Sequence, residues 1–226
     1  MIHLPKTRAV SLNERVPFHC RLCGGCCRYV ADSIMLEPMD AYYLARYLRE
    51  QGQPEMGPDT VLAQYAHAEW LDDHLPIFLL NTVGTMGVCV FLKAGRCSVY
   101  EARPHVCRIY PFSAAPGSRG RDFHYYLCTE KSHHFADGTV TAKDWLSQNF
   151  SREARDALKA DYDALPVIGQ NLRSMGKEQF KHMLFQFIYY RYYNYELDEP
   201  FLPQFLSNLE KLKELTGAAN EKAVTE

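Results

Sequence analysis

The sequence predicts an α+β protein, with a small cysteine-rich core of short strands and helices followed by a helical C-terminal part. Two observations support this division. All eight cysteines of the 226-residue chain lie between Cys20 and Cys128. After residue 140, by contrast, apolar side chains recur at the spacing of helices that bury one face. We therefore predict a cysteine-rich domain at residues 1–135 and a helical extension packed on it at residues 136–226.

Turn residues set the order of elements in the first part. The segment "SIMLEPMDAYYLARYLREQG" predicts a short strand and then a helix, with Pro38 in its first turn and Gly52 just past its end. A second helix is predicted at residues 58–73. The segment "PIFLLNTVGTMGVCVFLKAGRC" predicts two strands joined by a turn at Gly84 and Gly87, with one cysteine in the second strand.

Shorter elements carry the remaining cysteines. The segment "SVYEARPHVCRIYPF" predicts a single helical turn around Cys107, and "DFHYYLC" predicts a strand that ends on Cys128. The segment "HHFADGTV" predicts the turn into the second part. Helices are expected there at about residues 142–162, 177–194 and 203–216, the first capped by Thr141, and the tail "AANEKAVTE" is expected to fray.

The composition excludes several classes of partner. A net charge of −2 provides no basic field that would attract nucleic acid. The chain has no apolar run long enough to cross a membrane, and its first residues lack the apolar core of a secretory signal. We therefore expect a cytoplasmic protein with no nucleic-acid and no membrane partner. In that reducing compartment, eight cysteines favour metal or redox chemistry over disulfides.

The densest cysteine cluster is "HCRLCGGCCRYV", which contains Cys20, Cys23, Cys26 and Cys27. A CxxC unit lets the chain turn tightly enough to aim two sulfurs at one centre. Adjacent side chains normally diverge, so Cys26 and Cys27 are poor joint ligands of one ion. They serve two centres, or two metals of one cluster, or one of them is not a ligand. The adjacency indicates more than a single mononuclear site.

Spacing distinguishes iron from zinc only weakly. The first three cysteines match the start of a ferredoxin run, which then fails at Val30, and the second CxxC unit of a zinc ribbon is missing.

Arg103 and Arg108 flank Cys107 and are candidates for binding the cofactor by offsetting thiolate charge. The histidines are weaker ligand candidates than the cysteines; those nearest to cysteines are His19, His105 and His124, whereas His133 and His134 are expected to be exposed loop residues.

The segments "CRLCGGCC" and "GVCVFLKAGRCSVYEARPHVCRIYP", with a later cysteine, resemble the YkgJ-type cysteine-cluster family. That family has a zinc- or iron-chelating domain marked by CxxCxxCC, and the resemblance covers about residues 18–128. It implies a set of metal ligands: Cys20, Cys23, Cys26, Cys27, Cys89, Cys97, Cys107 and Cys128. The domain is also related to flagellin lysine N-methylase, which implies a protein substrate and methyl transfer.

These observations lead to one expectation and two alternatives. We expect the cysteines to converge on an iron-sulfur cluster of the 4Fe-4S type, because the vicinal pair suits a polynuclear centre. The first alternative is a structural zinc-chelating module whose helical part holds a protein partner. The second is a protein lysine N-methyltransferase, although the sequence has no strand followed by a GxGxxG loop for a methyl donor. The sequence therefore leaves open whether the protein is an enzyme.

Overall fold

The computed structural model describes residues 5–71, 74–117 and 123–225, with side chains up to residue 219. The strands are β1 (Thr7–Ala9), β2 (Arg15–Val16), β3 (Met35–Leu36), β4 (Ala66–Leu71), β5 (Leu75–Leu80), β6 (Thr82–Val83), β7 (Val88–Cys89), β8 (Leu92–Lys93), β9 (Arg96–Cys97), β10 (Phe112–Pro116), β11 (Phe123–Cys128) and β12 (Val140–Thr141). The α-helices are α1 (Pro38–Glu50), α2 (Pro58–Tyr65), α3 (His105–Ile109), α4 (Ala142–Asn149), α5 (Arg152–Arg173), α6 (Lys177–Ile188) and α7 (Phe201–Thr225). Short 3-10 turns are η1 (Gly25–Cys27), η2 (Tyr100–Ala102) and η4 (Ser132–Phe135), and η5 (Tyr189–Tyr193) is a π-helix.

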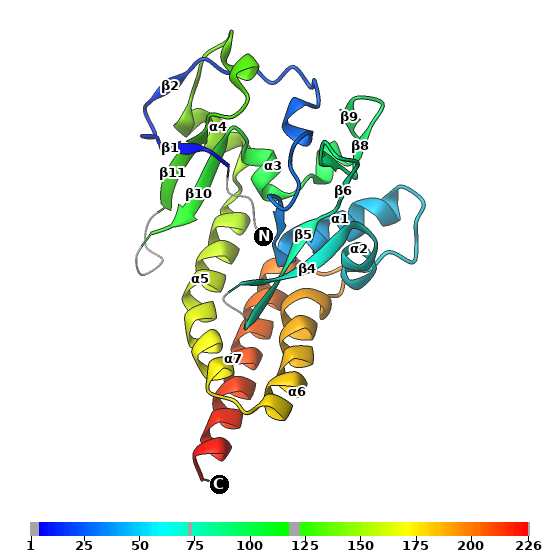
Figure 1. The fold of residues 1–226 in the computed structure, drawn as a ribbon, viewed down its shortest axis with the longest axis vertical. Coiled ribbons are helices and arrows are strands. Elements are labelled where there is room, and N and C mark those ends of the chain that lie inside the picture. Colours follow the sequence, from blue (N-terminus) through cyan, green and yellow to red (C-terminus); the bar gives the residue numbers. More distant parts are fainter. Residues whose placement is uncertain (1–4, 72–73, 118–122, 226) are drawn as a thin grey trace.

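This mixture of helices and short antiparallel strands confirms the α+β class. Figure 1 shows the small sheets and short helices at one end of the molecule, and the long helices α5, α6 and α7 running side by side away from them. The described strands form two three-stranded sheets, β1-β11-β10 and β3-β5-β4, and three two-stranded ones, all of them antiparallel. These small sheets hold the loops that carry the cysteines.

Helix α1 begins where the sequence predicted. Pro38 occupies its first turn, and Glu37 and Asp40 form a reciprocal capping box that satisfies backbone N–H groups otherwise left without partners. Gly52, just past the end, adopts a left-handed φ of 87°. One face of the helix, which includes Tyr42 and Leu44, is fully buried. The predicted strand before it is β3, so both expectations for this segment are confirmed.

The predicted helix at residues 58–73 is wrong in its second half. Helix α2 ends at Tyr65, and the chain continues as strand β4, which pairs with β5 along its whole described length. Strand β5 is buried along its whole length. Residues 66–71 are therefore stabilised more by pairing with β5 than by extending a short helix. Residues 72 and 73 lie outside the described part. The predicted turn at Gly84 and Gly87 is confirmed and joins β6 to β7, which contains Cys89. The strand before the turn is interrupted at Asn81, so that β5 and β6 belong to different sheets.

The C-terminal helices differ from the prediction in length. The helix expected at 142–162 is two helices, because the chain breaks after Asn149 and restarts with Ser151 as the N-cap of α5. Thr141 caps α4 as predicted, its hydroxyl accepting a hydrogen bond from the N–H of Asp144. The tail predicted to fray is helical to Thr225. None of the helices in the described residues is long and apolar enough to cross a membrane.

Aromatic and charged side chains join the helical part to the first part. The rings of Phe78 in β5 and Tyr192 in η5 pack edge to face, with centroids 4.8 Å apart. The guanidinium of Arg191 is buried in η5 and forms ion pairs with Asp161 of α5 and Glu37 at the start of α1. The aromatic stretch around these residues therefore contributes Phe187, Tyr192 and Tyr195 to the core, whereas Phe185 and Tyr189 are exposed.

Candidate metal centre

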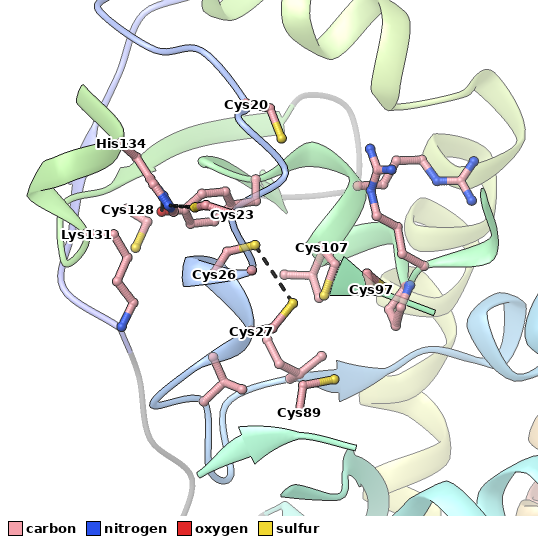
Figure 2. Close-up of a pocket in the computed structure, with 18 of the residues that line it drawn as sticks. Cys20, Cys23, Cys26, Cys27, Cys89, Cys97, Cys107, Cys128, Lys131 and His134 are labelled. Atoms are coloured by element: carbon pink, nitrogen blue, oxygen red, sulfur yellow. Dashed lines mark hydrogen bonds between the residues drawn. The ribbon is translucent and has the colours of Figure 1, made fainter. Parts of the chain in front are cut away.

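All eight cysteines line one cavity of about 380 Å³, and all are free thiols. They reach it from the loop before and within η1, from β7, β9 and α3, and from the end of β11. Figure 2 shows their sulfurs arranged around this space, with Cys20 and Cys23 on the side away from Cys89. The structure thus brings together every cysteine that the sequence proposed as a metal ligand.

Backbone contacts hold the CxxCxxCC loop against the two hairpins that carry Cys89 and Cys97. The N–H groups of Tyr29 and Val30 donate to the carbonyls of Met86 and Gly87 beside the β6–β7 hairpin. Gly24 adopts a left-handed φ of 66°, and a Cβ atom there would lie 2.7 Å from the carbonyl oxygen of Gly95. Only glycine allows this close approach without strain. The loop sequence therefore fixes the position of its cysteines relative to both hairpins.

Helix α3, which carries Cys107, is anchored to α1 by a buried carboxylate. Asp40 accepts hydrogen bonds from the backbone N–H of His105 at 2.7 Å and from the N–H of Glu37 at 3.0 Å, and its carboxylate lies 3.3 Å from the imidazole of His105. Burial alone would lower the pKa of His105, but the Asp40 carboxylate raises it above its ordinary value. His105 is thus committed to Asp40 and does not line the cavity, which removes one of the weaker ligand candidates from the sequence.

Five thiols on the side of the cavity toward Cys89 form what we call the inner group: Cys26, Cys27, Cys89, Cys97 and Cys107. Cys89 is buried, Cys26 is exposed, and the other three are half-buried. The sulfurs of Cys26 and Cys27 lie 4.0 Å apart, because the tight turn η1 directs both neighbouring side chains into the cavity. Hydrogen bonding from the Cys27 thiol lowers the pKa of Cys26 to about 7, and the same thiol lowers the pKa of Cys89. Cys27 thus lies within reach of two sulfurs, and its single S–H can be donated to one of them at a time.

Burial opposes charging the rest of this group. It raises the pKa of Cys107 well above its ordinary value, and nearby Cys26 and Cys89 thiolates raise it further. Burial also raises the pKa of Cys97. A bound cation would reverse this, since a coordinated thiol is deprotonated outright. The inner group therefore has donor chemistry suited to a metal and unsuited to several free thiolates.

Cationic side chains surround the inner group. Arg103 and Lys131 both act electrostatically on Cys26, where they favour its thiolate. Arg103 also stacks over the ring of Tyr100, with 3.9 Å from its guanidinium carbon to the ring centroid. Arg108 lines the cavity and donates to the carbonyl of Glu101. Both arginines proposed from the sequence are thus at the cavity, and Lys131 is a cation there that the sequence did not single out.

A separate cluster lies beside Cys23. The sulfur of Cys23 and ring nitrogens of His133 and His134 all lie within 4.8 Å of one another. The sulfur is 3.3 Å from Nε2 of His134, whose Nδ1 is 2.8 Å from the hydroxyl of Tyr110. Sequence reasoning assigned both histidines to an exposed loop. The only signal in the sequence was their position shortly after Cys128, which did not show that η4 folds back over the CxxC turn.

The remaining candidates lie at the margins of the cavity. Cys20 is exposed and interacts with the hydroxyl of Tyr100. Cys128 is half-buried at the end of β11, where burial raises its pKa. His19 lines the cavity from an exposed position, whereas His124 is exposed on β11 and does not reach it.

The spacing of the sulfurs tests which kind of metal fits. A tetrahedral zinc ion with bonds of about 2.3 Å holds its thiolates roughly 3.8 Å apart. Within the described ranges, no three cysteine sulfurs lie within 4.8 Å of one another. Apart from the close pair Cys26 and Cys27, the inner thiols are thus not gathered as the ligands of one zinc ion would be, and this arrangement favours a polynuclear cluster.

Comparison with known proteins identifies the kind of domain that this cavity belongs to. Residues 19–137, more than half of the chain, match the CxxCxxCC family, whose description is "Putative zinc- or iron-chelating domain". The chain belongs to this family, which confirms the resemblance drawn from its cysteine pattern. It therefore contains the cysteine-rich metal-binding domain of the family, extended by helices α4 to α7 beyond the matched region.

One curated relative is uncharacterized protein MJ0661 of Methanocaldococcus jannaschii. It is 32% identical over 100 residues, which is 43% of this chain and 46% of the relative. The alignment thus spans less than half the length of that protein. No solved structure matches the chain.

Proposed function

We propose that the protein holds an iron-sulfur cluster of the 4Fe-4S type on the inner thiols, with Cys26, Cys89, Cys97 and Cys107 as ligands. The observation that carries this proposal is that, among the described residues, no three of these sulfurs lie within 4.8 Å of one another, whereas one tetrahedral zinc ion holds its thiolates roughly 3.8 Å apart. The family description, which names zinc or iron, supports a metal at this place without deciding between the two.

Cys27 is assigned as a hydrogen-bond donor and not as a ligand. Its sulfur is only 4.0 Å from that of Cys26, and its thiol interacts with both Cys26 and Cys89. Hydrogen bonds to ligand sulfurs raise the reduction potential of a cluster, since they stabilise the more negative reduced state. In the vicinal pair, Cys26 therefore binds the metal and Cys27 raises the reduction potential of the cluster.

A cluster with four cysteine ligands has no open coordination position, so the chemistry that it supplies is one-electron transfer. Arg103 and Lys131 then offset the negative charge of the thiolates. The lysine N-methylase activity implied by the family resemblance has no separate support. The described strands pair only antiparallel, and the doubly wound parallel sheet that binds many nucleotide-derived cofactors does not occur among them.

The test is the metal content of the full chain purified without oxygen. We expect iron and acid-labile sulfide near about four of each per chain, together with a brown colour and charge-transfer absorption. Cys26→Ala should lose the cluster, whereas the matched variant Cys27→Ala should keep its iron and sulfide and show a lower reduction potential. Zinc without sulfide in the wild-type protein would refute the iron-sulfur assignment. Equal loss of cluster in both variants would refute the role given to Cys27.

A further inference from the structure

The cluster of Cys23, His133 and His134 has the geometry of a separate metal site. A tetrahedral zinc ion with ordinary bond lengths places a sulfur and a nitrogen ligand about 3.5 Å apart. The sulfur of Cys23 lies 3.3 Å from Nε2 of His134, and the donor atoms of all three residues are within 4.8 Å of one another. Unlike the inner thiols, these donors are close enough together for a single ion.

The space between the three donors is open because residue 25 is glycine. A Cβ atom at Gly25 would lie 2.8 Å from Nε2 of His133, 2.8 Å from Nε2 of His134 and 3.3 Å from the sulfur of Cys23. Three donor atoms from two distant segments thus point at one small volume next to the Gly25 backbone. A single methyl group would fill that volume. This convergence is independent of the hydrogen bond between Cys23 and His134.

Tyr110 orients one of the imidazoles for coordination. Its hydroxyl is 2.8 Å from Nδ1 of His134, and Nε2 of the same ring lies 3.3 Å from the sulfur of Cys23. In the tautomer that binds a metal through Nε2, the proton is on Nδ1 and is donated to the phenol oxygen. Metal-binding histidines commonly donate their second ring nitrogen to such a partner. The rings of Phe18 and Tyr110 also pack edge to face against His134 and limit its rotation.

We propose that Cys23, His133 and His134 bind one mononuclear divalent cation of borderline softness, Zn²⁺ being the best match, in a site separate from the inner thiol group. Thiolate and imidazole donors together favour such an ion. Among the described residues no fourth cysteine, histidine or carboxylate joins these three donors within the same distance. A tetrahedral ion therefore keeps one position open for water or for an anionic group of a substrate.

This site goes beyond the proposed iron-sulfur function, and among the described residues none of the inner sulfurs lies within 4.8 Å of all three of its donor atoms. Figure 2 shows Cys23 next to His134, with Cys26 between them and the deeper sulfurs of Cys27 and Cys89. Both sites open into the same cavity. A ligand held at the cation would therefore lie in the cavity that also borders the inner thiols, which would place a Lewis acid and an electron-transfer centre in one chamber.

The experiment is a Co²⁺ titration of the full chain after removal of zinc, with iron and sulfide measured in the same samples. Cobalt reports tetrahedral geometry and thiolate ligation through its visible and near-ultraviolet absorption. We expect one equivalent to bind with the spectrum of a single thiolate ligand. Gly25→Ala and His134→Ala should weaken this binding at least tenfold. Tyr110→Phe should weaken it about tenfold, as loss of a partner to a metal-binding histidine does.

Matched controls separate this effect from unfolding. Gly217→Ala makes the same substitution on α7, where a Cβ atom meets nothing within 4 Å, and His124→Ala removes an exposed histidine of β11. Both should bind cobalt like the wild type, and Gly25→Ala should keep its full iron and sulfide content. The backbone of Gly25 does not require a left-handed φ, and the two contacts shorter than 3.0 Å are with the ends of the His133 and His134 side chains, so alanine is accepted there by a shift of these rings away from Cys23.

Each outcome supports or overturns the second site. Wild-type cobalt affinity in Gly25→Ala would overturn it and leave Cys23 and His134 as a hydrogen-bonded pair. Loss of iron and sulfide together with cobalt in Gly25→Ala and His134→Ala would also overturn it, because all the donors would then belong to one centre. If iron and sulfide are absent from every sample but Gly25→Ala still loses one equivalent of cobalt, the iron-sulfur proposal fails and the second site is supported.

Discussion

Replacing Arg191 by leucine tests how firmly the helical part is attached to the metal-binding part. The guanidinium is 3% exposed, and it pairs with Asp161 at the middle of α5 and with Glu37 at the start of α1. Leucine leaves both carboxylates buried without a cation. Breaking a buried ion pair by removing one partner costs roughly 3–5 kcal/mol, mainly because the remaining charge has no compensation. For a chain of this size, such a loss lowers the melting temperature by about 10 °C.

The assay is urea unfolding at pH 8, followed by circular dichroism, of protein prepared without oxygen. The control is Lys181→Leu, which breaks an exposed pair with Glu178 on α6 and should change the free energy of unfolding by less than about 0.5 kcal/mol. A loss below about 1 kcal/mol for Arg191→Leu would refute the reasoning. In that case the carboxylates of Asp161 and Glu37 would be reached by water once the guanidinium is gone.

Three further changes have expected outcomes. Burial raises the pKa of Glu37 from 4.5 to about 7. Between these values the folded state binds a proton that the unfolded state has lost, so the stability of the fold falls as the pH rises through this window. Glu37→Gln should flatten this slope in urea midpoints measured from pH 5 to pH 8. A wild-type slope in the variant would show that another group titrates. Gly24→Ala should destabilise the protein by at least about 1 kcal/mol and lower its iron content, because the left-handed φ and the contact with Gly95 both oppose a Cβ atom. An unchanged iron content would contradict this prediction. Arg103→Met should lower the reduction potential of the cluster, measured by a dye-linked redox titration, because a cation near Cys26 is lost; an unchanged potential would exclude an electrostatic role for Arg103.

Local signals in the sequence were sufficient for some elements and insufficient for others. Helix α1 was predictable because its start and end are marked by Pro38 and Gly52, which act within one turn of the chain. Strand β4 was missed although "AHAEW" alternates apolar and polar side chains, because this short alternation follows directly on the helical pattern of α2, and the strand is stabilised by pairing with the buried β5. The break before Ser151 was also missed, although a serine cap is itself a local signal for the start of a helix.

The candidate site was likewise predictable from the sequence only in part. The cysteines were predictable as a group, because CxxC spacing and crowded thiols are typical of metal binding. Their partition into an inner group and a pair with histidines was not, because it depends on contacts between distant segments. Cys23 and His134 are separated by 111 positions in the chain. Only the folded structure shows that η4 places its histidines over the turn at Gly25.

The helical part also contributes to the geometry of the metal centre, through a continuous set of polar contacts. Arg191 in η5 pairs with Glu37, whose backbone N–H is bound by Asp40 in the first turn of α1. The same Asp40 carboxylate accepts a hydrogen bond from the N–H of His105 at the start of α3, two residues before Cys107. Because each link is buried or half-buried, a shift of η5 would be transmitted to the position of Cys107 through side chains that are largely shielded from water. The cysteine-rich domain and the helices after it are therefore best understood as one mechanical unit, in which the C-terminal helices help to fix a ligand that lies 84 residues before Arg191.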